Sequence, residues 1–163
     1  MTAVDTALDW IGRWLARRLR REAPGEEPFI PADPQALRRT LRPADVLLVA
    51  GGSKLSTAIK YLTQSIWSQA ALYVGGALGS PAGREPHTLI EVNPVDGCIS
   101  VPLSKYERFH TRICRPVGLT NDDREEVIRF VVSRLGTQYD MRNIIDLALP
   151  CLRRRCQPTG AVA

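Results

Sequence analysis

Short apolar runs bounded by turn residues constrain the fold more than any other feature of this chain. Each run spans only a few residues and is rich in aliphatic and β-branched side chains, which suit a pleated, half-buried surface. Glycine, proline or asparagine follows most of them, as expected for turns between strands. The runs lie in ADVLLVAGG (44–52), QAALYVGG (69–76), TLIEVNP (88–94), GCISVPL (97–103) and TRICRPVG (111–118). We therefore expect a small sheet of short strands.

Helical patterns flank and interrupt these runs. Asp33 and Pro34 begin a short helix, and Ser53 begins a second that presents leucine and isoleucine on one face through residue 65. SKYERFH (104–110) indicates a helical turn, Thr120 caps a helix over 121–135, and QYDMRNIIDLAL (138–149) also looks helical. This order predicts an α+β fold, with a small, mostly antiparallel sheet packed with helices.

The N-terminal segment predicts an amphipathic helix over residues 4–22. Trp10 and Trp14 widen its apolar face, and Arg13 and Arg17 lie on its basic side. Such a helix can lie on an anionic membrane surface, or it can pack on its own domain with a solvated basic face. A proline-rich linker follows, so residues 1–33 are expected to form a helix and linker outside the main domain.

Composition limits the classes of protein to which this chain can belong. The chain has 163 residues and a formal net charge of +5, which is typical of one domain with an anionic partner permitted. It has neither a secretory signal pattern nor an apolar run of about 20 residues, which favours a cytoplasmic protein in peripheral contact with the inner membrane face. Nothing resembles a nucleic-acid platform. The four cysteines form no C-x-x-C pair and only two histidines are present, so we expect neither a metal nor a cofactor.

Two polar residues in the apolar runs are candidate site residues. Gln69 begins one run, and Glu91 lies between Ile90 and Val92 in the next. A carboxylate in such a strand needs a hydrogen-bonding partner or an exposed face. A thiol hydrolase needs a base beside its cysteine and a polar group that orients the base. Glu91 is therefore either an orienting group or an outward-facing residue of a two-faced strand.

Three long segments carry a resemblance to a known family. They are LRPADVLLVAGGSKLSTAIKYLTQSIWSQAALYVGG, LIEVNPVDGCISVPLSKYERFHTRICRPVGL and RLGTQYDMRNIIDLA. Together they resemble the YiiX/YebB-like cysteine hydrolases, some of which are called lipo-like proteins. These belong to the circularly permuted papain-like class related to NlpC-type peptidases. The resemblance implies a small sheet with packed helices and hydrolysis of amide, ester or thioester bonds, with lipid or acyl substrates among relatives.

The same resemblance implies where a catalytic site would lie and shows two departures from it. The family histidine position is occupied by Gln69, and Glu91 matches the third polar position. The nucleophilic cysteine is expected last, at the start of a helix, but Cys151 and Cys156 are followed by no such pattern. The nucleophile is therefore unknown. We expect an incomplete hydrolase domain over residues 34–149 and a disordered basic tail over 150–163.

These observations predict a family member that is inactive in this chain and binds an acyl or lipid ligand. Three alternatives stay open from the sequence. The chain could be a fragment of an active hydrolase, or a thiol hydrolase that pairs Cys151 or Cys156 with His87 or His110. A third is a regulatory protein that binds a partner through its basic helix. Cys98 and Cys114 are expected to be buried strand residues.

Overall fold

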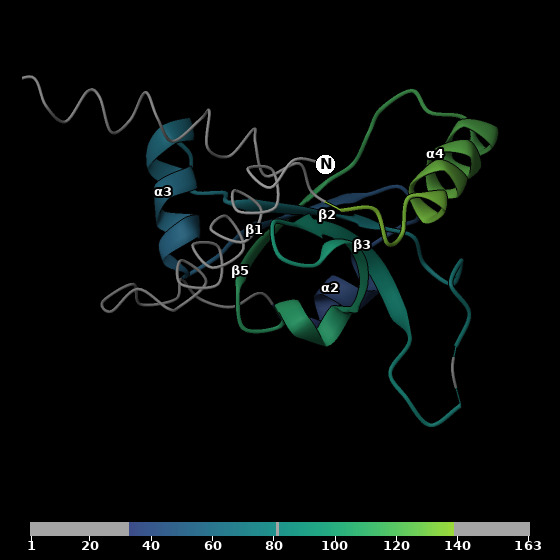
Figure 1. Ribbon diagram of the computed structural model, residues 1–163. Helices are drawn as coiled ribbons and strands as arrows, with labels where there is room; N and C mark the ends of the chain where they lie inside the picture. The colour runs from purple at the N-terminus through teal and green to yellow at the C-terminus, as the bar shows by residue number, and fades with distance from the viewer. Residues whose placement is uncertain (1–32, 81, 139–163) are drawn as a thin grey trace, which may run out of the picture.

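The computed structural model describes residues 33–80 and 82–138, and its centre is one antiparallel sheet (Figure 1). The strands are ordered β4-β3-β2-β1-β5, and every neighbouring pair is antiparallel. Their bounds are β1 (Val46–Ala50), β2 (Gln69–Tyr73), β3 (His87–Asn93), β4 (Gly97–Pro102) and β5 (His110–Cys114). The small antiparallel sheet expected from the apolar runs is thus confirmed.

Three α-helices and one 3₁₀ helix accompany the sheet in the described part of the chain. They are α2 (Pro34–Thr40), α3 (Lys54–Thr63), α4 (Asn121–Ser133) and η1 (Leu103–Tyr106). The fold is therefore α+β, as predicted. The main difference in bounds is the helical turn expected over 104–110, because η1 ends at Tyr106 and His110 already begins β5.

Side-chain caps explain where the three α-helices begin. The Asp33 carboxylate accepts a hydrogen bond from the Gln35 backbone N–H at 2.9 Å, and the Ser53 hydroxyl accepts one from Ser56 at 3.1 Å. Thr120 and Asp123 cap each other reciprocally. Each cap satisfies a backbone donor that the first turn of a helix otherwise leaves unpaired.

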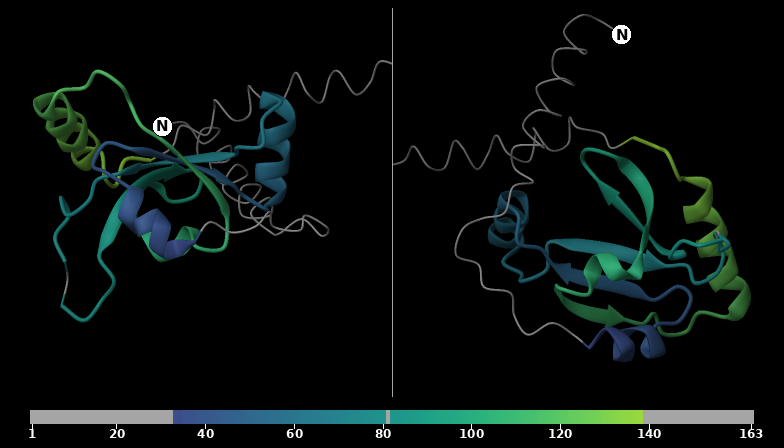
Figure 2. Two further views of the ribbon diagram at one scale, coloured as in Figure 1. Left: turned by 180° about the vertical axis from the view of Figure 1, so that it is seen from behind. Right: turned by 90° about the horizontal axis from the view of Figure 1, so that it is seen from below.

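One face of the sheet carries the larger core. Leu47, Ala71 and Glu91 lie side by side across β1, β2 and β3, so they share this face. The helices α2 and η1 cover it, as Figures 1 and 2 show. The buried apolar residues here are Leu37, Leu41, Leu47, Val49, Ala71, Leu89, Val101, Leu103 and Tyr106.

The opposite face is covered in part by α4. Ile90 and Cys98 of the sheet form a second buried cluster with Val74. Ile128, Val131, Val132 and Leu135 from α4 and the turn after it pack against that cluster. The helix α3 instead stands at one end of the sheet (Figure 1) and contributes no fully buried side chain.

An ion pair between the buried carboxylate of Asp45 and the partly exposed Arg115 holds α2, β1 and β5 together. Asp45, which directly precedes β1, accepts hydrogen bonds from Arg115 Nε at 2.9 Å and from Arg115 Nη2 at 2.8 Å. Arg115 also donates to the Thr40 carbonyl at the end of α2, at 2.7 Å. Burial alone would raise the pKa of Asp45, but the hydrogen bonds from Arg115 and from the Arg42 N–H outweigh it and lower that pKa.

Several expectations concern residues that the structure does not describe. The amphipathic helix over 4–22, the basic tail over 150–163 and nearly all of the helix over 138–149 lie outside the described residues. The domain boundaries at 33 and 149 therefore stay predictions. Within residues 33–80 and 82–138, none of the helices has the length and apolar character needed to cross a bilayer.

Candidate functional site

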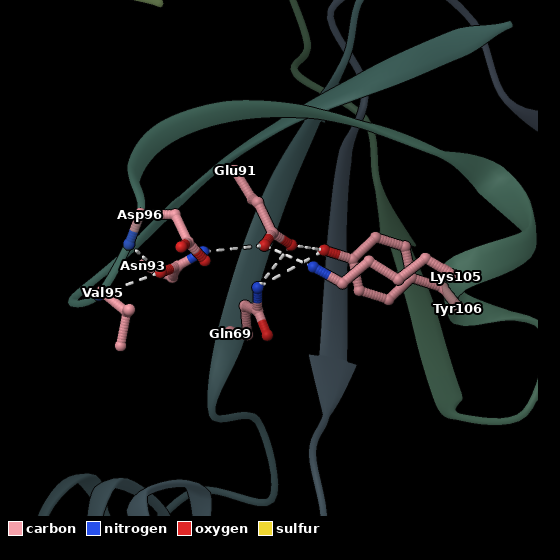
Figure 3. A network of polar contacts seen from close by, with 7 residues as sticks. All are labelled: Gln69, Glu91, Asn93, Val95, Asp96, Lys105 and Tyr106. Carbon is pink, nitrogen blue, oxygen red and sulfur yellow. Dashed lines mark hydrogen bonds and ion pairs between the residues drawn. The ribbon is translucent and has the colours of Figure 1, made fainter. Parts of the chain in front are cut away.

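The sheet brings Gln69 and Glu91 together. Glu91 of β3 pairs with Ala71 of β2, and Gln69 lies two residues before Ala71 on the same face. The Gln69 amide nitrogen Nε2 donates a hydrogen bond to Glu91 Oε2 at 2.6 Å. The two candidates singled out from the sequence thus contact each other directly (Figure 3).

Glu91 is the centre of a network that the first turn of the next helix completes. Only 2% of this residue is exposed. Besides Gln69, it accepts hydrogen bonds from Lys105 Nζ at Oε1 and from the Tyr106 hydroxyl at Oε2. Asn93 Nδ2 lies 3.4 Å from Oε1. Both carboxylate oxygens therefore have two donors each, which rules out the outward-facing alternative for Glu91.

Tyr106 is held as a neutral phenol by this arrangement. Burial raises its pKa far above the ordinary tyrosine value, and the hydrogen bond to the Glu91 carboxylate and its negative charge raise the pKa further. The Lys105 ammonium supplies the positive charge that a buried carboxylate needs. The network therefore surrounds the Glu91 carboxylate with donors, and Tyr106 is one of them as a protonated phenol.

The network continues into the turn between β3 and β4. The Asn93 carbonyl oxygen Oδ1 accepts from the backbone N–H of Val95 at 3.0 Å and of Asp96 at 2.8 Å. Asparagine commonly stabilises a turn in this way. The orientation of Asn93 toward Glu91 is thus tied to the shape of the hairpin (Figure 3).

This set of groups has limited chemical capacity. An amide has no pKa near neutrality and cannot take a proton from a thiol. Both Glu91 oxygens already accept hydrogen bonds, so neither is available to orient or deprotonate another group. Among the described residues, no cluster of histidine, cysteine or carboxylate side chains could hold a metal ion.

The described cysteines lie away from the Gln69–Glu91 pair. Cys98 pairs with Val92 and packs with α4 on the opposite face of the sheet. Burial raises the pKa of its thiol, which makes it a poor nucleophile. Cys114 pairs with Val46 at the far end of β1. The expectation of a buried strand cysteine is confirmed for Cys98, whereas Cys114 is half-buried. Cys151 and Cys156 lie outside the described residues.

The two histidines have other neighbours. His87 Nδ1 contacts the Ser100 hydroxyl at 2.8 Å across β3 and β4. His110 begins β5, where its ring stacks on Trp67 with the ring centroids 5.2 Å apart. Trp67 lies two residues before Gln69, so His110 is at the same end of the sheet.

Sequence reasoning missed Lys105, Tyr106 and Asn93 as members of the site. The first two lie in SKYERFH, which was interpreted as a helical turn without a role. Their one signal is that this turn directly follows β4, so it can fold back over the sheet beside β3. The candidate membrane-contact residues Trp10, Arg13, Trp14 and Arg17 lie outside the described residues.

Comparison with known proteins finds no matching family model and no matching curated protein. The geometry of the site is therefore the basis for any functional conclusion.

Proposed function

We propose that this chain is a non-hydrolytic member of the permuted papain-like cysteine hydrolases that binds an acyl or lipid ligand. The observation that carries the proposal is the 2.6 Å hydrogen bond from Gln69 Nε2 to Glu91 Oε2. In the family pattern that the sequence resembles, these two positions hold the catalytic base and the group that orients it. Here the base position is an amide that donates to the orienting carboxylate.

The same contact explains why binding is favoured over catalysis. Covalent catalysis by a thiol requires a base that accepts its proton. The Glu91 carboxylate orients the Gln69 amide as it would orient an imidazole. The amide, however, has no group that accepts a proton near neutral pH. On this proposal, the contact between the two family positions is retained and the proton transfer is lost.

Two polar groups on the outer side of the network support ligand binding. The Gln69 amide oxygen points away from Glu91 (Figure 3). The Lys105 side chain is 34% exposed while it contacts Glu91. An acceptor and a cation together suit the polar head of an acyl compound, such as a hydroxyl or carboxylate.

The test is to assay hydrolysis and binding on the same protein. We expect acyl esters and thioesters of several chain lengths to be hydrolysed at the buffer rate by wild type and by Gln69→Ala. We expect fatty-acid affinity, measured by calorimetry, to fall about tenfold in Gln69→Ala because one hydrogen bond is lost. Gln35→Ala, which changes an exposed glutamine on α2, should leave the affinity unchanged.

Turnover that is inhibited by iodoacetamide would contradict the proposal and favour a thiol hydrolase that uses Cys151 or Cys156. The absence of fatty-acid binding by wild type would contradict its binding part. Rapid labelling of one thiol at neutral pH would identify the nucleophile in the first case.

A further inference from the structure

The helix α3 and the turn after it expose three large apolar side chains. Tyr61 is 76% exposed, Leu62 40% and Ile66 51%. None of the ten residues of α3 is buried. The helix stands at the end of the sheet in each view (Figures 1 and 2), so its outer side faces away from both cores. Large apolar side chains gathered in one place on a surface mark an interaction site.

The charged side chains of α3 and of the segments that adjoin it in sequence are all positive. The sequence contains neither aspartate nor glutamate between Val46 and Arg84, whereas Lys54 and Lys60 lie on α3 itself. Lys54 is exposed and lies seven residues before Tyr61, which places both on one side of the helix. The whole chain carries a formal net charge of +5. An anionic partner is therefore favoured over a neutral or cationic one.

The size and residue types of this surface fit an anionic bilayer better than an anionic protein. A specific protein interface buries about 1,200 Å² or more in total, far more than three side chains on a short helix can supply. A bilayer surface needs only a few side chains to insert among lipid headgroups. Proteins that bind a bilayer surface commonly place tyrosine at the membrane–water boundary and aliphatic side chains deeper in the lipid, with lysine beside the headgroups.

We propose that the outer side of α3, with Tyr61, Leu62 and Ile66, docks this protein on an anionic lipid bilayer. Tyr61, Leu62 and Ile66 enter the interface, and Lys54 contacts the anionic headgroups. Trp67 follows Ile66 and is half-buried against His110, so it lies next to the docked surface. The proposal uses none of the residues of the Gln69–Glu91 network and stands whether or not an acyl ligand binds there.

The first experiment is cosedimentation of the full chain with vesicles of phosphatidylcholine, alone or mixed with phosphatidylglycerol. We expect binding to the mixed vesicles that falls as salt is added. The Tyr61→Ser/Ile66→Ser variant should bind at least tenfold more weakly, because two inserted apolar side chains are lost. Phe130→Ser is the matched control, since Phe130 is 57% exposed on α4, and it should bind as wild type does.

A second experiment separates α3 from the N-terminal segment, whose Trp10 and Trp14 offer a competing contact. Trp10→Phe/Trp14→Phe leaves Trp67 as the only tryptophan. We expect brominated lipids in the mixed vesicles to quench Trp67 fluorescence, and Tyr61→Ser/Ile66→Ser to abolish the quenching.

Three results would overturn the proposal. They are equal vesicle binding by the α3 variant and the Phe130→Ser control, an absence of Trp67 quenching, and concentration-dependent self-association that the α3 variant removes. The last would identify a second copy of the chain as the partner. None of these results depends on fatty-acid affinity, so this proposal and the proposed function can fail separately.

Discussion

At the scale of single residues, Glu91 shows what a buried charge requires. A carboxylate that leaves water must be matched by an opposite charge and by hydrogen bonds to its remaining lone pairs. Lys105 supplies the charge, while Gln69 and Tyr106 supply donors from β2 and η1. Each of these donors loses its partner if the carboxylate is removed. The network thus behaves as one unit rather than as separate contacts.

Glu91→Ala should therefore be among the most destabilising single changes in the described chain. We expect a loss of about 2–4 kcal/mol in the free energy of unfolding, because the donors of Gln69 and Tyr106 lose a buried acceptor and the Lys105 ammonium loses its partner. Glu91→Gln keeps the shape and part of the hydrogen bonding, so its loss should be smaller. Chemical denaturation measures both, with the exposed Glu126→Ala as control. A loss below about 1 kcal/mol for Glu91→Ala would show that Glu91 is not held as described.

At the scale of elements, the edge strand β4 is protected by the segment that follows α4. The Cys98 N–H donates to the Thr137 carbonyl at 2.9 Å, and the Gly136 N–H donates to the Cys98 carbonyl at 2.9 Å. These two hydrogen bonds cover backbone groups that an edge strand otherwise leaves open to association. Gly97 makes the approach possible, because a Cβ atom there would lie 2.2 Å from the Thr137 oxygen.

Gly97→Ala should break this contact. Its backbone has a φ of +74°, which strains any other residue, and the added methyl group collides with backbone. We expect a loss of about 1–3 kcal/mol in the free energy of unfolding and faster amide exchange at Cys98. Gly79→Ala is the matched control, since Gly79 has a φ of +75° with open space around it. Equal losses in the two variants would mean that the collision with Thr137 contributes nothing.

At the scale of the whole molecule, the pair of Asp45 and Arg115 joins the first strand to the last. The hydrogen bonds from Arg115 and Arg42 to Asp45 lower the pKa of Asp45 below its value in the unfolded chain, although burial opposes the shift. The contribution of the pair to stability is therefore complete above the unfolded pKa of about 3.9 and is lost as the pH falls through the lower folded pKa. The contribution of this pair to folding stability therefore depends on pH in the acid range.

Acid unfolding should reveal this dependence. We expect Asp45→Asn to be less stable than wild type at neutral pH, and the difference between them to shrink as the pH falls below about 4. The measurement is the free energy of unfolding from denaturant titrations across the acid range. Asp122→Asn, on the exposed first turn of α4, is the control. A difference that is constant with pH would show that the charge of Asp45 plays no part.

The elements could be predicted because their patterns are local. Alternating or continuous apolar runs gave all five strands, and caps such as Ser53 and Thr120 gave the helix starts. The antiparallel α+β class followed from their order. Gln69 and Glu91 were recognised as candidate site residues from their position in apolar strands, and the structure places them in contact.

The rest of the site depends on contacts between residues distant in sequence. Whether Glu91 faced inward could not be decided from Ile90 and Val92 alone, because both faces of the sheet bury apolar residues. Lys105 and Tyr106 reach Glu91 only because η1 turns back over the sheet. The register between β2 and β3 fixes these contacts, and a shift by one residue would place Glu91 on the opposite face.

The order of the strands also determines when the sheet can be completed on the ribosome. The strands β2, β3 and β4 follow one another and can pair as soon as they emerge. The strand β1 borders β2 on one side but waits for β5 on the other, where residues 46–50 pair with residues 110–114. Until β5 is synthesised, β1 therefore has one unpaired edge, and an unpaired edge of this kind is prone to association with other chains.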